Sequence, residues 1–323
     1  MNRSVRSRLK VNAVKPLVSL RYLSSRLDTR LTRLEEIADD IKSHYTIRSE
    51  MNEKKSKART FRVPSQELKL IQRRIKNNIL SQFELDDAAH GGVRGKSPAS
   101  NAAQHLGQRC VVNVDVKQFF DKVSHRRVYR LFRHELQFGQ DVARLLTRLT
   151  TLNGLLPQGA PTSTVIANLL LTLPVDKPIV AEAHRHEVRY TRFVDDITFS
   201  GSNPRSLVNK VGRLLSLRGL AIHRKKSKRN SKSKLKIASQ SSPQEVTGLI
   251  VNSQKGASVS RKRRDGVRAA IFGLRDARDS AALRVAVTSI RGRIAHIRQF
   301  NPGSAKRMQR YLENTISRLE AGI

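Results

Sequence analysis

Apolar side chains recur at helical spacing in the first quarter of the chain. Between residues 24 and 45, the repeating apolar positions are Leu27, Leu31, Leu34, Ile37 and Ile41. A second stripe with the same spacing runs through 65–80. These stripes predict two amphipathic helices, and Ser65 is placed to cap the second one. The polar segment 49–60 and the Gly- and Pro-containing segment 90–100 predict exposed connections.

The middle of the chain predicts strands as well as helices. The run "CVVNVDV" at 110–116 is almost entirely apolar, and "YTRFVDDITFSG" at 190–201 predicts two short strands around a turn. A helix is predicted in 124–136, and "LLPQGAPTSTVIANLLLTL" predicts a turn followed by a helix that Pro174 ends. A helix at 207–215, a short strand in "EVTGLIVN" and a helical remainder follow. This order predicts an α+β fold, an antiparallel sheet backed by helices on one face.

The charge of the chain points to a polyanionic partner. Among 323 residues there are 63 Lys and Arg against 26 Asp and Glu, a net charge of +37. Residues 201–323 alone carry 28 basic and 6 acidic side chains. Self-repulsion of this size favours nucleic acid as the partner, gripped mainly by the last third of the chain. The basic, Ser-rich segment 224–236 is expected to lie on this surface.

A membrane partner is not expected. No apolar stretch approaches the roughly 20 residues that a membrane span needs, and Trp, a common interfacial anchor, is absent. The N-terminal 27 residues are basic and free of acids, as in a transit peptide, but they contain no clear cleavage signal. We therefore expect a cytoplasmic protein. With a single cysteine, Cys110, the chain cannot form an internal disulfide.

Three aspartates stand in unusual surroundings. Asp195 and Asp196 fall at the turn of a predicted hairpin, and Asp115 lies between Val114 and Val116 in the most apolar predicted strand. A buried carboxylate needs a cationic partner. One interpretation is an ordinary turn and a buried salt bridge to Arg or Lys. The other is a divalent metal held between Asp115 and Asp195, with Asp196 close by, which is the arrangement that phosphoryl transfer requires.

The ordered motifs resemble a known family. "VVNVDVKQFFDKV", "LLPQGAPTSTVIANLL", "YTRFVDDITFSG" and "GLAIHRKKS" are similar to the palm motifs of reverse transcriptases, and "RTFRVPSQELKLIQRRI" is similar to their fingers. "NAAQH" at 101–105 and "VTG" at 246–248 match signatures of the bacterial retron reverse transcriptases. The resemblance implies a right-hand polymerase fold. Its expected parts are an N-terminal helical extension (1–48), fingers (49–109, with the NAxxH insertion at the palm border), a palm (110–240) and a mostly helical thumb (241–323).

The resemblance also implies roles for individual residues at the reaction centre. Asp115, Asp195 and Asp196 become the catalytic ligands of two Mg²⁺ ions, for which Mn²⁺ can substitute. Phe120 matches the gate that excludes a ribose 2′-hydroxyl; the alternative is that both Phe119 and Phe120 are core residues. The residues that match positions lining the nucleotide pocket or holding the triphosphate are Val116, Gln158, Gly159, Arg59 and Lys57. Lys226 matches the lysine that protonates pyrophosphate, although the neighbouring Lys225 competes for this assignment.

Other matched positions concern RNA. The resemblance and the basic segment together predict RNA contacts at Asn101, His105, Val246, Thr247, Gly248, Lys225, Lys228 and Arg229. Simpler alternatives remain open: Asn101 and His105 as a capped, satisfied core pair, "VTG" as a strand end, "PQGAP" as a helix-initiating turn, and Lys57 as a solvated charge.

Three positions depart from the family pattern. Phe193 stands where the hairpin motif usually begins with Tyr, Thr164 stands where Pro commonly follows "PTS", and "HGGV" at 90–93 replaces an aromatic-containing loop. None of these changes removes an expected metal ligand, so we expect the activity to be retained.

The function implied by the resemblance is that of a retron enzyme. Such an enzyme binds a cognate structured noncoding RNA, primes from a guanosine 2′-hydroxyl and uses dNTPs to make a branched RNA–DNA molecule. Enzymes of this family act in anti-phage defence with an effector or toxin protein. The alternatives are a group II intron-like or other bacterial reverse transcriptase, or a catalytically silent RNA-binding scaffold. No motif specifies an oligomeric state.

Overall fold

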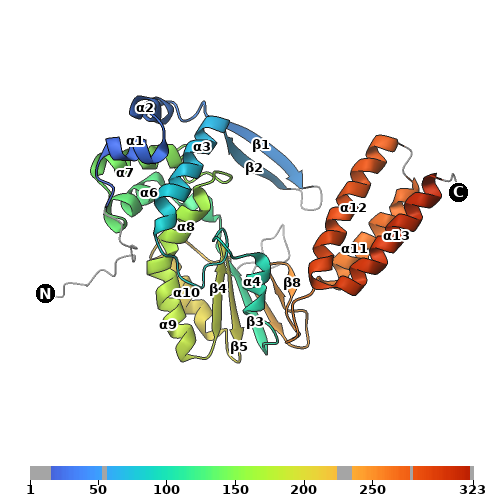
Figure 1. Cartoon of the computed structure of the whole chain (residues 1–323). Coiled ribbons are helices and arrows are strands. Elements are labelled where there is room, and N and C mark those ends of the chain that lie inside the picture. Colours follow the sequence, from blue (N-terminus) through green and yellow to red (C-terminus); the bar gives the residue numbers. More distant parts are fainter. Residues whose placement is uncertain (1–15, 53–56, 224–234, 277–278, 321–323) are drawn as a thin grey trace.

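The computed structural model describes residues 16–52, 57–223, 235–276 and 279–320. Figure 1 shows an N-terminal set of helices, a central sheet with helices beside it, and a C-terminal bundle of helices. A two-stranded hairpin extends from the N-terminal helices towards the bundle (Figure 1). The chain is thus α+β, as the sequence predicts.

The N-terminal stripe forms two helices rather than the single predicted one. They are α1 (Leu20–Leu27) and α2 (Leu31–Asp39). Asp28 adopts the left-handed conformation (φ 46°), and its N–H bonds to the carbonyls of Ser24 and Ser25, which closes α1. The sequence did not reveal the interruption at Asp28, because both helices bury leucines in the same core and the apolar spacing therefore continues from α1 to α2.

Residues 49–52 and 57–60 do not form the irregular connection that the sequence suggested; residues 53–56 lie outside the described residues. Residues 49–52 and 57–60 belong to an antiparallel pair of strands, β1 (Tyr45–Asn52) and β2 (Lys57–Pro64). The prediction was wrong because the segment has no alternation of apolar and polar residues. Its pairing depends on main-chain hydrogen bonds, which do not leave such a pattern.

The next helices lead from the hairpin to the sheet. They are α3 (Gln66–Arg74), a π-helical turn η1 (Ile75–Ile79), the short η2 (Leu80–Gln82) and α4 (Pro98–Ala103). The Ser65 hydroxyl accepts a hydrogen bond from the Leu68 N–H at 3.3 Å, which confirms the predicted cap.

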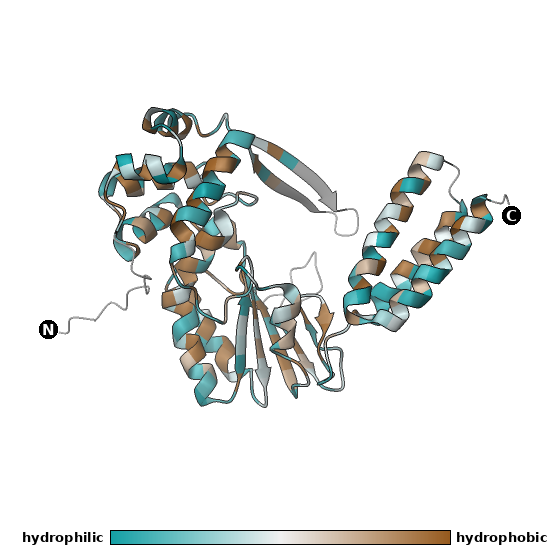
Figure 2. Cartoon of the chain, viewed as in Figure 1, coloured by the Kyte–Doolittle hydropathy of each residue, from teal (hydrophilic) through white to brown (hydrophobic). Residues whose placement is uncertain are grey.

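The central sheet has the strand order β4-β5-β3-β6, and every neighbouring pair is antiparallel. The strands are β3 (Cys110–Asp115), β4 (Arg189–Phe193), β5 (Asp196–Gly201) and β6 (Lys236–Ser239). Val112, Val114, Ile197 and Phe199 are buried on one face, within the main hydrophobic core. Figure 2 shows brown, hydrophobic segments in this sheet and in the helices beside it.

The helices between β3 and β4 contribute most of that core. They are α5 (Phe119–Lys122), α6 (His125–Arg130), the π-helical η3 (Leu131–Glu135), α7 (Gln140–Thr150), α8 (Ser163–Leu171), the π-helical η4 (Thr172–Asp176) and α9 (Lys177–Arg185); α10 (Ser206–Ser216) follows β5. In Figure 1, α8, α9 and α10 lie beside the sheet.

Pro174 does not end its helix, contrary to the prediction. The helical segment continues through η4 into α9, because a π-helical turn accommodates the missing N–H of the proline. Among the described helices, Ser163–Arg185 is long and apolar enough to cross a membrane by length and composition. It is a core helix of the fold, since Ile166, Leu169 and Ile179 are fully buried in the main core.

"EVTGLIVN" forms a tight hairpin instead of one strand. Its strands are β7 (Glu245–Val246) and β8 (Leu249–Ile250), and Val246 pairs with Leu249. The predicted helical remainder is confirmed as α11 (Arg261–Phe272), the short η5 (Gly273–Asp276), α12 (Ser280–Phe300) and α13 (Pro302–Glu320). These elements share a second hydrophobic core with β7 and β8.

Candidate active site

The strand register brings the three aspartates to one end of the sheet. Asp115, the last residue of β3, lies directly opposite Asp196, the first residue of β5. Opposed residues of an antiparallel pair share a face, with Cβ atoms about 5 Å apart. The N–H of Val116 donates to the carbonyl of Asp195 at 3.0 Å. Residues 80 positions apart in the sequence therefore meet, as the metal interpretation requires.

A divalent metal fits this arrangement through its ligand chemistry. Asp115 and Asp195 are half-buried and Asp196 is exposed, so these carboxylates are near the surface. Within the described residues, no three Asp, Glu, His or Cys side chains are gathered as a ready-made metal site. Mg²⁺ does not require such a cage, because it binds through one or two carboxylates together with substrate phosphates and water. The predicted Mg²⁺ remains a prediction that the donor set supports.

The "GLAIHRKKS" motif approaches the same end of β3. Val116 forms a bridge with Ile222, and the His223 N–H donates to the Asp115 carbonyl at 2.8 Å. His223 is the last described residue before a gap. Four predicted residues, Lys225, Lys226, Lys228 and Arg229, lie outside the described residues.

Phe119 and Phe120 have different surroundings. The ring of Phe119 is 2% exposed and belongs to the core, whereas Phe120 is only partly buried. The two rings meet edge to face, with centroids 5.5 Å apart. Of the two, Phe120 is therefore the one available to a substrate, and its gate role remains a prediction. Val116 is buried, so any contact of this residue with a nucleotide would be through its backbone.

The "PQGAP" turn lies against β2. The Arg62 N–H donates to the Gln158 carbonyl at 3.1 Å. Gly159 has a φ of 115°, and a Cβ there would lie 3.0 Å from the Arg62 carbonyl oxygen, so only glycine permits this approach. Lys57 and Arg59 lie on the same strand. The structure thus places the backbone of two predicted nucleotide-binding segments side by side.

Asn101 and His105 are buried at the polar face of the sheet. Both side chains are fully buried. The two ring nitrogens of His105 bond to the hydroxyls of Ser200 (2.6 Å) and Thr191 (2.7 Å). Burial, followed by the charges of Arg189 and His90, lowers the His105 pKa to about 3. This placement agrees with the core-pair alternative for His105. Asn101 is buried but not satisfied as that alternative supposed, because neither its Nδ2 nor its Oδ1 has a hydrogen-bond partner among the described residues. Since both side chains are buried, an effect of these residues on RNA would be indirect.

The "VTG" residues link the second core to α4. Val246 is buried, and Thr247 Oγ1 donates to the Pro98 carbonyl at 2.8 Å. The Asn113 amide on β3 donates to the Glu245 carbonyl at 2.9 Å. The "VTG" turn therefore contacts α4, the helix on which "NAAQH" begins, which the positions of the two signatures in the sequence did not indicate.

The three departures from the family pattern also come together. A Cβ at Gly91 would lie 2.6 Å from the Val194 N–H nitrogen and 2.9 Å from the Phe193 carbonyl carbon. A Cβ at Gly92 would collide with the Thr164 side chain. The "HGGV" loop thus packs closely against Phe193 and Thr164. The three departures from the family pattern are therefore neighbours in the structure.

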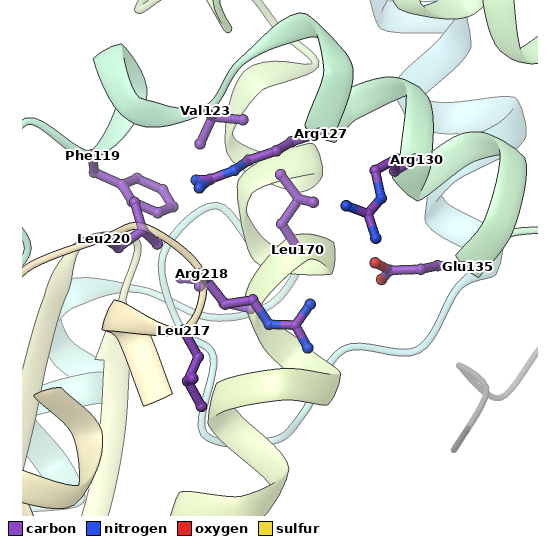
Figure 3. Close-up of a pocket in the computed structure, with 10 residues that line it drawn as sticks. Phe119, Val123, Arg127, Arg130, Glu135, Leu170, Leu217, Arg218 and Leu220 are labelled. Atoms are coloured by element: carbon purple, nitrogen blue, oxygen red, sulfur yellow. The ribbon is translucent and has the colours of Figure 1, made fainter. Parts of the chain in front are cut away.

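A separate pocket lies behind Phe119, and the sequence did not predict it (Figure 3). Its volume is about 180 Å³. Arg127, Arg130, Arg218 and Glu135 surround an apolar wall that includes Leu170 and Leu220 (Figure 3). Burial and then the nearby charge of Arg218 lower the Arg127 pKa, while burial raises the Glu135 pKa. In Figure 3 the Arg127 side chain extends towards Phe119, whereas Arg130 and Arg218 lie on the side of the pocket that carries Glu135.

The chain is similar in sequence to known polymerases, in agreement with the arrangement of the aspartates. Residues 51–251 match the family model described as "Reverse transcriptase (RNA-dependent DNA polymerase)". The retron Mx65 reverse transcriptase of Myxococcus xanthus is 32% identical over 273 residues, which cover 78% of this chain and 60% of the relative. The retron Ec86 reverse transcriptase of Escherichia coli is 29% identical over 279 residues, covering 85% and 80%.

A third relative is the retron Se72 reverse transcriptase of Salmonella heidelberg (strain 579083-10), 31% identical over 73% of this chain and 62% of the relative. The chain spans less than two thirds of the length of the Mx65 and Se72 enzymes. The family model covers all three aspartates and both retron signatures. This chain belongs to the reverse transcriptase family.

Proposed function

We propose that the chain is a retron-type RNA-directed DNA polymerase whose reaction centre is formed by Asp115, Asp195 and Asp196. The observation that carries this proposal is the pairing of Asp115 with Asp196 at the end of β3 and β5. Family membership and the similarity to retron enzymes support it. So does the contact of the "VTG" turn with α4, the helix on which "NAAQH" begins.

The architecture is consistent with a right hand. In this proposal the fingers comprise 49–109 and include the β1–β2 hairpin, the palm comprises 110–240, and the thumb comprises 241–323. Residues 1–48 form a helical extension. In Figure 1 the hairpin lies above the sheet and extends towards the bundle of α11, α12 and α13, which lies to the right of the sheet. Template and primer would run between them.

The aspartates would hold two Mg²⁺ ions, or Mn²⁺ in their place, and these ions would activate the primer hydroxyl and neutralise charge on the dNTP phosphates. Phe120 would meet the sugar of the incoming dNTP. Arg59 and Lys57 on β2, together with the backbone at Val116, Gln158 and Gly159, would position the nucleotide. Lys226 would supply a proton to pyrophosphate.

Charge supports RNA and DNA as the bound polymers. The exposed basic residues of α11 include Arg261, Lys262, Arg263 and Arg268. Such a surface binds a duplex through its phosphates and 2′-hydroxyls. Lys225, Lys228 and Arg229 would extend this basic surface. Asn101, His105 and the "VTG" residues would affect RNA binding by supporting the elements beneath the surface.

The retron relatives extend the proposal to biology. The chain would bind its cognate noncoding RNA in the cytoplasm, prime from a guanosine 2′-hydroxyl and retain the branched RNA–DNA product. It would act with an effector or toxin protein in anti-phage defence.

The test of the proposed chemistry is direct incorporation of labelled dNTPs by the purified protein on an RNA template with Mg²⁺. The double change Asp195→Asn with Asp196→Asn should abolish synthesis and leave RNA binding intact. Synthesis by the double variant would refute the metal assignment, and RNA binding without synthesis by the unmodified protein would favour the silent scaffold.

The retron assignment has its own test. Nucleic acid that co-purifies with the protein from its native locus is treated with RNase. A short single-stranded DNA that survives and carries a 2′-linked nucleotide at its end supports the retron assignment. Its absence, with dNTP incorporation retained, would favour another bacterial reverse transcriptase.

A further inference from the structure

The turn that carries Asp195 has a strained backbone. Phe193 pairs with Asp196, so Val194 and Asp195 form a two-residue hairpin loop. Val194 has a φ of 60°, whereas Asp195 does not have a positive φ. A positive φ at the first position only is typical of a type II′ turn, which usually has glycine there. A β-branched residue persists in this conformation only when its surroundings impose it.

One surrounding group is Gly91. A Cβ at this position would lie 2.5 Å from Val194 Cγ2, so the loop backbone is in close contact with the turn. The loop is itself held in place. The His90 N–H donates to the Arg192 carbonyl at 2.8 Å, and the Asn168 amide donates to the Gly91 carbonyl at 2.8 Å.

The second group is the guanidinium of Arg192, which is fully buried. Its Nη1 donates to the Val194 carbonyl at 2.9 Å and to Asn168 Oδ1 at 2.8 Å. Its Nε and Nη2 donate to the two carboxylate oxygens of Asp176 at 2.8 and 2.6 Å. The same guanidinium thus bonds the strained turn and the buried end of η4.

Asp176 fixes the orientation of this arginine. The Asp176 carboxylate also accepts a hydrogen bond from the Tyr190 hydroxyl at 2.7 Å. Burial alone would lower the pKa of Arg192, but the charge and hydrogen bonds of Asp176 override it and raise this pKa. A buried ion pair is weak evidence for stability, but it can impose one geometry. The planar guanidinium of arginine has donors in fixed directions and can therefore hold several acceptors in one geometry, which the ammonium group of lysine cannot do.

We propose that Arg192 is a positioning residue for the carboxylates of Asp195 and Asp196. Its guanidinium bonds the Val194 carbonyl, Gly91 packs against the backbone nitrogen and side chain of Val194, and together they hold the strained turn that presents both acids. This inference rests on the proposed function, because it assigns a role in the same reaction. It predicts that substitutions at Arg192 and at Gly91, which are far apart in the sequence, both lower kcat and raise the Mg²⁺ requirement.

The first test is Arg192→Lys, which keeps the charge and removes the fork. The rate kcat for dNTP incorporation should fall by about 10- to 100-fold, as expected when reacting groups are displaced. The Mg²⁺ concentration for half-maximal rate should rise severalfold, while KM for the dNTP changes little. The matched control is Arg189→Lys on the same strand, where Arg189 also donates to a carbonyl, that of Gln104, but is exposed. This control should behave like the unmodified enzyme.

The second test is Gly91→Ala, which displaces the turn without touching the Arg192–Asp176 pair. It should also lower kcat and raise the Mg²⁺ requirement. Gly95→Asn in the same loop is its control, because a Cβ there meets no atom within 4 Å and asparagine tolerates the positive φ.

The outcomes separate this inference from the proposed function. Loss of rate in proportion to unfolded protein, with an unchanged Mg²⁺ requirement, would show that Arg192 is only structural and would overturn the inference. Unchanged kinetics in both folded variants would do the same. If Arg192→Lys does not fold, Gly91→Ala decides alone, and if neither folds, the network is structural and the inference fails. Activity retained by the Asp195→Asn and Asp196→Asn double variant would instead refute the proposed function.

Discussion

Thr247 Oγ1 donates a 2.8 Å hydrogen bond to the carbonyl of Pro98, 149 positions earlier in the chain. Thr247 and Gly248 both have positive φ, at 46° and 85°, which identifies a type I′ turn between β7 and β8. The turn therefore presents the threonine hydroxyl to the first residue of α4. This contact helps to attach the C-terminal bundle, which shares its core with β7 and β8, to the central sheet.

Thr247→Val should weaken this attachment. Valine keeps the branched shape and the backbone strain of threonine, so the change isolates the hydrogen bond. Leaving the Pro98 carbonyl without its donor should lower the free energy of unfolding by about 1 kcal/mol, measured by chemical denaturation. Thr288→Val is the control, since its hydroxyl bonds only to the Arg284 carbonyl within the exposed face of α12. Equal effects at the two positions would contradict a linking role for Thr247.

The buried, neutral state of His105 predicts sensitivity to acid. Its folded-state pKa is about 3, below the ordinary value of 6.5, so the unfolded chain takes up a proton first as the pH falls. Stability is complete above pH 6.5 and is lost progressively towards pH 3. Linkage gives a loss of about 2 kcal/mol from His105 between pH 7 and pH 5.

The measurement is the free energy of unfolding of His105→Gln and of the unmodified protein at several pH values. The variant should lose less stability between pH 7 and pH 5. His90, whose pKa burial lowers to about 4, contributes in the same direction and remains in both proteins. Parallel pH curves for the two proteins would show that His105 is not the group responsible.

Phe120→Ala should relax the selection against ribonucleotides. In its proposed role the partly exposed ring occupies the space of a 2′-hydroxyl, so its removal should raise the ratio of rNTP to dNTP efficiency by about 10- to 100-fold. Phe119→Leu is the control, because the Phe119 ring is buried and packs against Phe120. The measurement is kcat/KM for a matched rNTP and dNTP. Unchanged discrimination would assign Phe120 to packing alone.

Gly159→Ala should separate the "PQGAP" turn from β2. An alanine Cβ at a φ of 115° would press on the Arg62 carbonyl at 3.0 Å, so the turn or the strand must move. We expect a loss of about 1–2 kcal/mol in stability and a higher KM for the dNTP.

The control for this change is Gly154→Ala, where φ is also positive (74°) but a Cβ meets no atom within 4 Å. It should lose stability through backbone strain without changing KM. An equal rise in KM for both variants would argue against a nucleotide-positioning role for the contact between Gly159 and Arg62.

The sequence by itself determined the strands and helices that have their own apolar pattern. β3, the β4–β5 hairpin, α3 with its Ser65 cap and α10 lie where the periodicity placed them. The sequence also singled out Asp115, Asp195 and Asp196, because a carboxylate within an apolar strand or hairpin is costly without a partner. This energetic cost is a local property of the carboxylate, and it does not depend on which strands pair.

The tertiary structure alone decided which distant residues meet. Main-chain pairing of β1 with β2 left no hydrophobic pattern in 49–60, and a π-helical turn carried the chain through Pro174. Arg192 and Asp176, Gly91 and Val194, and Thr247 and Pro98 are partners through packing between elements. No periodicity encodes such pairs, because their contact depends on how separate helices and strands close around shared cores.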